Sequence, residues 1–259
     1  MEIVQYITTH SGTFLLVLIR TGAILFTAPI FGAVNIPMTV KAGLSFVIAL
    51  VLAPLTAYVP VPASLPALVV GVAGEIMIGA AMGLTARFFF SGIEFAGQLA
   101  SFQMGIGMAT AYDPINSTQI TTIGKLMSIL TLLLFLAING HLLVIMALKK
   151  SFEVIPPYGF HLTPSLMESM VVYSKEVFIL GVKFAAPVVA VLLFVNVALG
   201  IMARTVPQLN MFAIGFGITI TVGFIMIMVS MPVFDVAARA VIDRMWESVF
   251  SIVQVMQHG

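Results

Sequence analysis

The sequence predicts an all-α integral membrane protein, and three observations support this fold class. First, 61% of the 259 residues are apolar and 8% are charged, and the mean hydropathy of +1.16 lies far above that of a soluble domain. Second, the chain contains six apolar runs, most of them long enough to cross a bilayer as a helix of about 20 residues. Third, prolines lie inside or at the ends of several runs, where each removes a backbone donor and kinks a helix.

The apolar runs predict helices over residues 13–34, 40–58, 65–90, 120–148, 170–202 and 210–234. Pro29 lies late in the first run, Pro187 lies inside the fifth, and Pro232 closes the sixth. A broken helix is tolerated at membrane depth only where protein or a cavity covers the freed backbone groups. We therefore expect other protein to surround these helices.

The connecting segments indicate how the helices are joined. Residues 58–66 contain three prolines and no charge, which predicts a short extended link between antiparallel helices. Residues 149–163 form the longest polar stretch, and Thr163 followed by Pro164 suits an N-cap and a first helical position. We place a domain boundary there, which divides the chain into residues 1–163 and 164–259.

The C-terminal segment, residues 235–257, has a different character from the apolar runs. Its apolar residues recur at spacings of three and four, opposite a row of charged residues. This pattern predicts an amphipathic helix that lies at the membrane surface or against a partner.

Composition and motifs exclude several functional classes. A formal net charge of +1 provides neither a basic patch for nucleic acid nor a polybasic anchor. The absence of cysteine excludes disulfides, thiolate metal sites and cysteine nucleophiles. The four histidines are scattered, and HExxH, P-loop, GxSxG and dinucleotide-binding signatures are missing. We expect a protein that is not an enzyme and holds no metal or cofactor, with His141 as a hydrogen-bonded structural residue.

The stretch 97–114, GQLASFQMGIGMATAYDP, is unusual in so apolar a chain. Glycine permits uncommon backbone angles and close approach, and methionine fills irregular gaps; the residues concerned are Gly97, Gly105, Gly107, Met104 and Met108. Pro114 ends any preceding helix, because proline disfavours the α region for Asp113. The stretch fits a pliable constriction inside a membrane pore, and it fits a helix connector with gap-filling methionines equally well.

A second feature is a ridge at four-residue spacing, made of Gly71, Glu75, Gly79, Gly83 and Arg87. Gly79 and Gly83 form a pair of small residues that lets another backbone approach closely in lipid. Ordinary helix packing explains the ridge. A sharper interpretation is that Glu75 or Arg87 pairs with a charge on a neighbouring subunit.

Ionisable residues within or near the ends of apolar runs are a third feature. A charge at the centre of a spanning helix costs about 2.5 to 3.5 kcal/mol on insertion scales. Six residues qualify: Arg20, Glu75, Lys125, Glu176, Lys183 and Arg204. Lys125 and Arg204 are each explained by snorkelling to the interface, but six such residues together are too many to be accidents of where the runs are drawn.

Three segments of the chain resemble one known family closely. They are FAGQLASFQMGIGMATAYDP (95–114), INGHLLVIMALKKSF (138–152) and KFAAPVVAVLLFVNVALGIMARTVPQLNMFAIGFG (183–217), and TAPIFGAVNIP (27–37) fits as well. They resemble the FliR family of the flagellar type III export apparatus, whose injectisome counterparts are the SctT proteins. The chain departs from the family after Phe216, where Gly217-Ile218 replaces the common proline and lysine.

The resemblance implies a fold and a function. It implies bent helical hairpins, with a FliP-like N-terminal part (1–163) fused to a FliQ-like C-terminal hairpin (164–259) that the amphipathic helix follows. It also implies a core subunit of the export gate, which forms with FliP-like and FliQ-like subunits, joined by an FlhB-like protein, the pore for unfolded flagellar proteins. The implied location is the bacterial inner membrane, in contact with lipid, at the flagellar basal body.

The resemblance also implies roles for individual residues. A loop that plugs the closed pore matches residues 103–114, which assigns the plug to Gln103, Met104, Gly105, Ile106, Gly107 and Met108, with Asp113 and Pro114 as its anchor. For Arg204 the resemblance suggests an ion pair with a FliQ-like neighbour. The ridge and the charges in apolar runs add Glu75, Arg87, Lys183, Gly79 and Gly83 as expected contacts between subunits.

Two alternatives come from other functional classes. A secondary transporter for a small solute also has broken helices and charges near the membrane midplane. It would show two repeats with matching breaks, whereas the halves of this chain differ in length and pattern. An intramembrane hydrolase would need a paired nucleophile and base, and the sequence offers no such pair beside His141.

Overall fold

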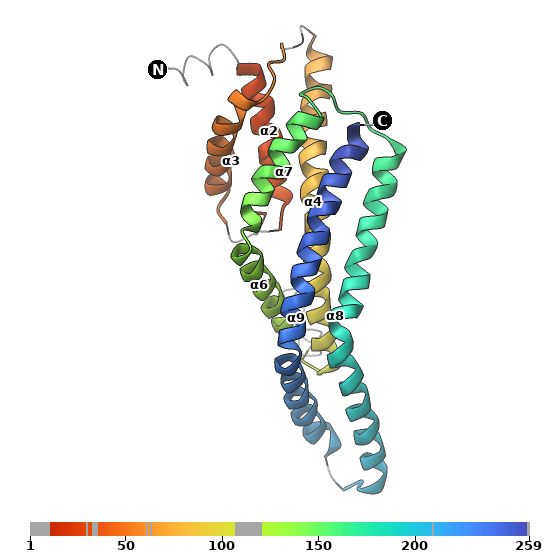
Figure 1. The fold of residues 1–259 in the computed structure, drawn as a ribbon. Helices are drawn as coiled ribbons and strands as arrows, with labels where there is room; N and C mark the ends of the chain where they lie inside the picture. The colour runs from red at the N-terminus through yellow and green to blue at the C-terminus, as the bar shows by residue number, and fades with distance from the viewer. Residues whose placement is uncertain are drawn as a thin grey trace. The chain divides into compact units, whose positions relative to one another are not determined.

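The structure, a computed structural model, describes residues 11–29, 31–32, 36–60, 62, 64–106, 121–208 and 210–257. All regular secondary structure in these residues is helical (Figure 1), which confirms the predicted fold class. The elements are α2 (Ser11–Thr27), α3 (Met38–Leu52), the 3₁₀ helix η1 (Ala53–Leu55), α4 (Leu65–Gln103), α6 (Thr122–Ala137), α7 (Gly140–Val154), α8 (Pro164–Thr205) and α9 (Met211–Gln257).

Four stretches of the described residues are long and apolar enough to cross a membrane. They are α3 with η1 (Met38–Leu55), α4, α8 and most of α9 (Ala213–Gln257). α6 and α7 together form a further candidate that is bent by 70° at the break between them. These helices identify the chain as an integral membrane protein.

Several helices extend beyond the predicted bounds. α4 continues to Gln103 rather than ending near residue 90. α9 passes through Pro232 without ending, so the predicted run 210–234 and the predicted amphipathic segment 235–257 form one helix. α8 likewise continues through Pro187. An interior proline costs a helix about 3 kcal/mol or more, and side chains such as Val188 and Phe234, which are buried beside these prolines, offset that cost by packing.

The predicted helix 120–148 is wrong as a single element, because it is two helices. Asn139 adopts a left-handed conformation, with φ of 59°. Asparagine is among the few residues other than glycine that occupy this region readily, and Gly140 follows it as the first residue of α7. This residue pair produces the bend.

The predicted start of α8 is confirmed. Thr163 Oγ1 accepts a hydrogen bond of 3.2 Å from the Leu166 amide, and Pro164 is the first helical residue. The hydroxyl satisfies one of the amide groups that the first turn of a helix leaves without a partner. The division of the chain into a FliP-like and a FliQ-like part at this point stays a prediction.

The chain forms two compact units, and α4, α8 and α9 contribute residues to both. The first unit comprises Met1–Phe88, Ile138–Ser174 and Asp243–Gly259, and the second comprises Phe89–Ala137 and Lys175–Ile242. In the first unit α2 packs against α3 and α4. In the second, α4, α6, α8 and α9 enclose a core that includes Ala100, Met104, Ile123, Leu192 and Ile227.

Candidate functional site

The first unit contains a buried ion pair that joins α2 to α4. The Arg20 Nε–H donates to Glu75 Oε2, and both side chains are 0% exposed. The guanidinium carbon also lies 4.1 Å from the centre of the Phe152 ring, a distance at which a cation is attracted to the ring face. Two of the six ionisable residues singled out in the sequence are therefore partners of each other.

The same pair holds the end of α7. Arg20 Nη1 lies 3.0 Å from the carbonyl oxygens of Ser151 and Ile155, and 3.2 Å from Ser151 Oγ. These carbonyls belong to the last turn of α7 and its C-cap, where a helix has unpaired acceptors and a partial negative charge. A cation is favourable there, so Arg20 caps α7 while it neutralises Glu75.

Glu75 uses its second oxygen for the loop between α7 and α8. Glu75 Oε1 accepts a hydrogen bond of 3.3 Å from the Tyr158 amide, and Tyr158 has a φ of 65°. Burial raises the pKa of Tyr158, and the neighbouring Glu75 carboxylate raises it further. One carboxylate therefore connects α2, α4 and the α7–α8 loop.

The glycines of the ridge on α4 give other parts of the chain room to approach. A Cβ atom at Gly79 would lie 2.6 Å from the Arg20 carbonyl oxygen, and one at Gly83 would overlap Thr27. One at Gly71 would overlap the Tyr158 ring. Glu75, Gly79 and Gly83 thus have contacts within this chain, and their role in contacts between subunits stays a prediction.

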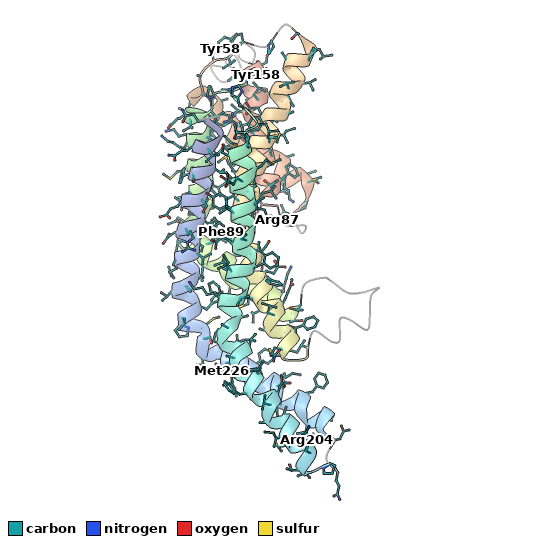
Figure 2. The ribbon with its side chains drawn as sticks, turned by 90° about the vertical axis from the view of Figure 1, so that its right-hand side faces the viewer. Tyr58, Arg87, Phe89, Tyr158, Arg204 and Met226 are labelled. Carbon is teal, nitrogen blue, oxygen red and sulfur yellow. The ribbon has the colours of Figure 1, made fainter. Side chains whose placement is uncertain are left out.

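The remaining predicted contact residues lie at the surface of the chain. Arg87, Lys183 and Arg204 are exposed, and Figure 2 shows Arg204 near the end of α8, where the chain turns towards α9. Among the described residues none of the three forms an ion pair. Their role in subunit contacts stays a prediction.

The second unit contains the described part of the predicted plug, at the end of α4. Gln103 is the last residue of α4 and is half-buried. Met104 is 0% exposed within the core, and Ile106 packs against that core. Gly105 has a φ of 83°, the left-handed conformation that commonly ends a helix. Gly107, Met108, Asp113 and Pro114 lie outside the described residues.

Met104 is buried in the core of this unit, where its side chain fills a gap between helices. Its assignment to the plug stays a prediction. Gly97 also behaves as a packing residue, since a Cβ atom there would lie 2.5 Å from the Gly124 Cα of α6. The plug assignment as a whole stays a proposal.

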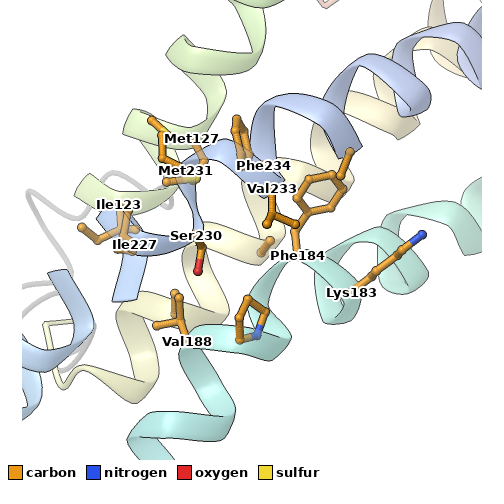
Figure 3. A pocket seen from close by; sticks show the side chains of 15 residues that line it. Ile123, Met127, Lys183, Phe184, Val188, Ile227, Ser230, Met231, Val233 and Phe234 are labelled. Carbon is orange, nitrogen blue, oxygen red and sulfur yellow. The ribbon is translucent and has the colours of Figure 1, made fainter. Parts of the chain in front are cut away.

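An apolar cavity of about 180 Å³ lies beside this core (Figure 3). α4, α6, α8 and α9 line it, and Pro187 is among its lining residues. Ser230 contributes a hydroxyl group, and Figure 3 shows the Lys183 ammonium directed away from the labelled apolar side chains. The lining offers no pair of groups suited to catalysis.

The described residues outside these sites include few side chains placed for metal binding or catalysis. Within the part of the chain that the structure describes, no three His, Cys, Asp or Glu residues are grouped so as to hold a metal ion. His141 Nδ1 is buried without a hydrogen-bond partner among those residues, so the expected hydrogen bond is not found at that atom.

Sequence reasoning missed the partners of the predicted residues. Nothing in the spacing paired Glu75 with Arg20, although both had been singled out as charges in apolar runs. It also missed Phe216, Thr219 and Gly223 of α9, which contact Met104 and Gly105. A glycine and a threonine at helical spacing in an apolar run were the available signal.

Comparisons with known proteins place the chain in a family. The family model described as "Bacterial export proteins, family 1" matches residues 11–245. The chain is 37% identical over 216 residues to the flagellar biosynthetic protein FliR of Escherichia coli (strain K12). The aligned residues make up 83% of this chain and 82% of that protein. The chain is 33% identical over 252 residues to FliR of Bacillus subtilis (strain 168), with coverage of 94% and 95%.

A further relative is FliR of Pectobacterium carotovorum subsp. carotovorum, at 33% identity over 235 residues and 88% of each chain. The family-model match spans every helix from α2 to α8 and most of α9. The chain therefore belongs to the bacterial export proteins, family 1.

Proposed function

We propose that this chain is a core subunit of a flagellar type III export gate, through which unfolded flagellar proteins leave the cell. The observation that carries the proposal is the similarity over most of the chain to proteins named flagellar biosynthetic protein FliR. The long apolar helices support a place in a membrane, and the similarity to flagellar biosynthetic proteins supports the flagellar basal body in the bacterial inner membrane. The chain acts as a pore and assembly component and not as an enzyme.

The proposal names FliP-like and FliQ-like subunits and an FlhB-like protein as partners. Exposed apolar side chains support an assembly or a lipid contact: Phe194, Val197 and Ile201 on α8 and Met228, Val229 and Val233 on α9 are exposed in the isolated chain. Arg204, at the same hairpin, would form an ion pair with an acidic residue of a FliQ-like neighbour. Arg87 and Lys183 are further candidates for subunit contacts.

The proposed plug comprises the segment 103–114. Methionine and glycine suit a seal that blocks ions at rest and deforms around a polypeptide. Met104 is a poor residue for testing this role, because its replacement by alanine would leave a cavity in the core and destabilise the chain by about 2–5 kcal/mol. Met108→Ala is the better variant, and we expect it to assemble and to leak small ions.

The proposed function is tested by co-expressing the tagged chain with FliP-like and FliQ-like proteins of the same organism. Native mass spectrometry of the purified material should show a defined hetero-oligomer that is lost when the chain is expressed alone. A stable monomer or homodimer that does not bind these partners would contradict the proposal and favour the secondary transporter.

A further inference from the structure

We propose that Phe216, Thr219 and Gly223 of α9 form a clamp that fixes the turn at which the chain leaves α4. The inference rests on the proposed function, because the turn comprises Met104 and Gly105 at the start of the proposed plug. The three clamp residues are positioning residues. They hold the turn and do not line the pore.

The first contact of the clamp is a buried hydrogen bond. Thr219 Oγ1 lies 3.1 Å from the Met104 carbonyl oxygen, and 115 residues separate the two in sequence. A carbonyl at the C-terminus of a helix has no partner within that helix, so the hydroxyl of α9 supplies one. Thr219 Oγ1 also lies 3.2 Å from the Phe216 carbonyl oxygen, and the single hydroxyl proton is shared between the two acceptors.

The second contact is made by the Met104 side chain, which is 0% exposed. A Cβ atom at position 223 would lie 2.5 Å from Met104 Cγ and 2.8 Å from Met104 Sδ and Cε. Any residue other than glycine at 223 would therefore push the methionine from its place. Methionine is flexible enough to leave by changing rotamer, which moves the turn without unfolding the helices.

The third contact is made by the Phe216 ring over Gly105. A Cβ atom at Gly105 would lie 2.6 Å from Phe216 Cε1. Gly105 needs glycine for a second reason, because its φ of 83° is strained for other residues. The ring therefore closes over a turn that only glycine forms with ease.

The three clamp residues share one face of α9, because their spacings of three and four residues correspond to one turn each. Gly217 lies between them in sequence but has open space around it, with no atom within 4 Å of an added Cβ. The clamp thus ties the start of the proposed plug to one face of α9, and a shift of that face would move the turn. Gly217 provides a matched control in the same helix.

The test uses the complete complex, purified with its partner subunits and reconstituted into liposomes loaded with potassium ions. We expect Gly223→Ala and Thr219→Val to assemble in wild-type yield and to raise the rate of potassium efflux several-fold. Gly217→Ala should leave the efflux rate unchanged. Thr219→Ser keeps the hydroxyl group, so its efflux rate should equal that of the wild type and not that of Thr219→Val. A purely structural role would lower the yield of complex and leave the efflux per assembled complex unchanged.

The outcomes distinguish the clamp from the plug. Met108→Ala is measured in parallel. If this variant leaks while Gly223→Ala and Thr219→Val stay as tight as wild type, the clamp is wrong and the plug stands. If none of the three leaks, both proposals are wrong. Should Gly223→Ala fail to assemble, Thr219→Val decides alone, because valine has nearly the shape of threonine and removes only the hydrogen bond.

Discussion

We predict that disrupting the buried pair of Arg20 and Glu75 lowers the free energy of unfolding. Glu75→Gln removes the charge but keeps the shape of the side chain. The two oxygens of Glu75 face two donors, the Arg20 Nε–H and the Tyr158 amide. Glutamine has one carbonyl oxygen, so one donor would face the amide NH₂ group instead.

The magnitude follows from burial. Both charged side chains are 0% exposed, so removing the carboxylate leaves an uncompensated guanidinium in the interior, which costs about 3–5 kcal/mol. Replacing both residues with methionine removes both charges, and exchanging a buried pair for apolar residues is often close to neutral. The Ile155 carbonyl would still lose its donor, at about 1 kcal/mol, whereas the Ser151 carbonyl keeps the Ile155 amide as a donor. The double variant Arg20→Met with Glu75→Met should therefore lose at least about 3 kcal/mol less than the sum of the losses in Arg20→Met and Glu75→Met measured separately.

The assay is unfolding in detergent, driven by SDS and followed through Trp246 fluorescence. Trp246 is the one tryptophan of the sequence and belongs to the same compact unit as the pair. Glu153→Gln is the matched control, because Glu153 forms ion pairs with Lys149 and Lys150 that are about half exposed; we expect a loss of about 0–1 kcal/mol there. The reasoning fails if Glu75→Gln loses no more than Glu153→Gln, or if the single losses simply add.

Three further predictions concern packing, pH and assembly. Gly79→Ala should destabilise the chain by about 1–3 kcal/mol, because its Cβ atom would lie 2.6 Å from the Arg20 carbonyl oxygen. Gly43 has open space around it, so Gly43→Ala should not destabilise the chain, and equal unfolding midpoints for the two variants would contradict the prediction. Because the folded state raises the pKa of Tyr158 above 10.0, its contribution to stability should be complete below that pH and lost as pH rises through the folded pKa; unfolding measured against pH should lose this dependence in Tyr158→Phe. Arg204→Glu should lower the yield of co-purified complex, and a reversed charge on the partner should restore part of it; full recovery of the single variant would exclude the ion pair.

The sequence predicted the existence of the helices better than their ends. Apolar runs mark where a helix is favoured, because burial in lipid or protein offsets the polar backbone. They do not show that α9 continues through Pro232, since packing on both sides of the proline compensates for a lost hydrogen bond. The break at Asn139 could have been predicted, because an asparagine followed by glycine is a turn signal. The apolar residues on both sides of this pair favoured one continuous helix instead.

The candidate site shows a similar limit. Glu75 was identified from the cost of a charge in an apolar run, which is a local property of the sequence. Its partner Arg20 is 55 residues away, and no periodicity encodes a contact between separate helices. The same reasoning applies to Thr219 and Met104, which are 115 residues apart. Local physics marks residues that need a partner, and only tertiary structure shows which partner they have.

The position of Met104 bears on how a seal at this segment would work. A seal that opens for a polypeptide and closes again needs one part that yields and one part that stays fixed. Met104 is buried, hydrogen-bonded through its carbonyl and enclosed at Gly223, so it belongs to the fixed part. The contacts from α9 thus help to fix the point at which the proposed plug begins, in addition to α4.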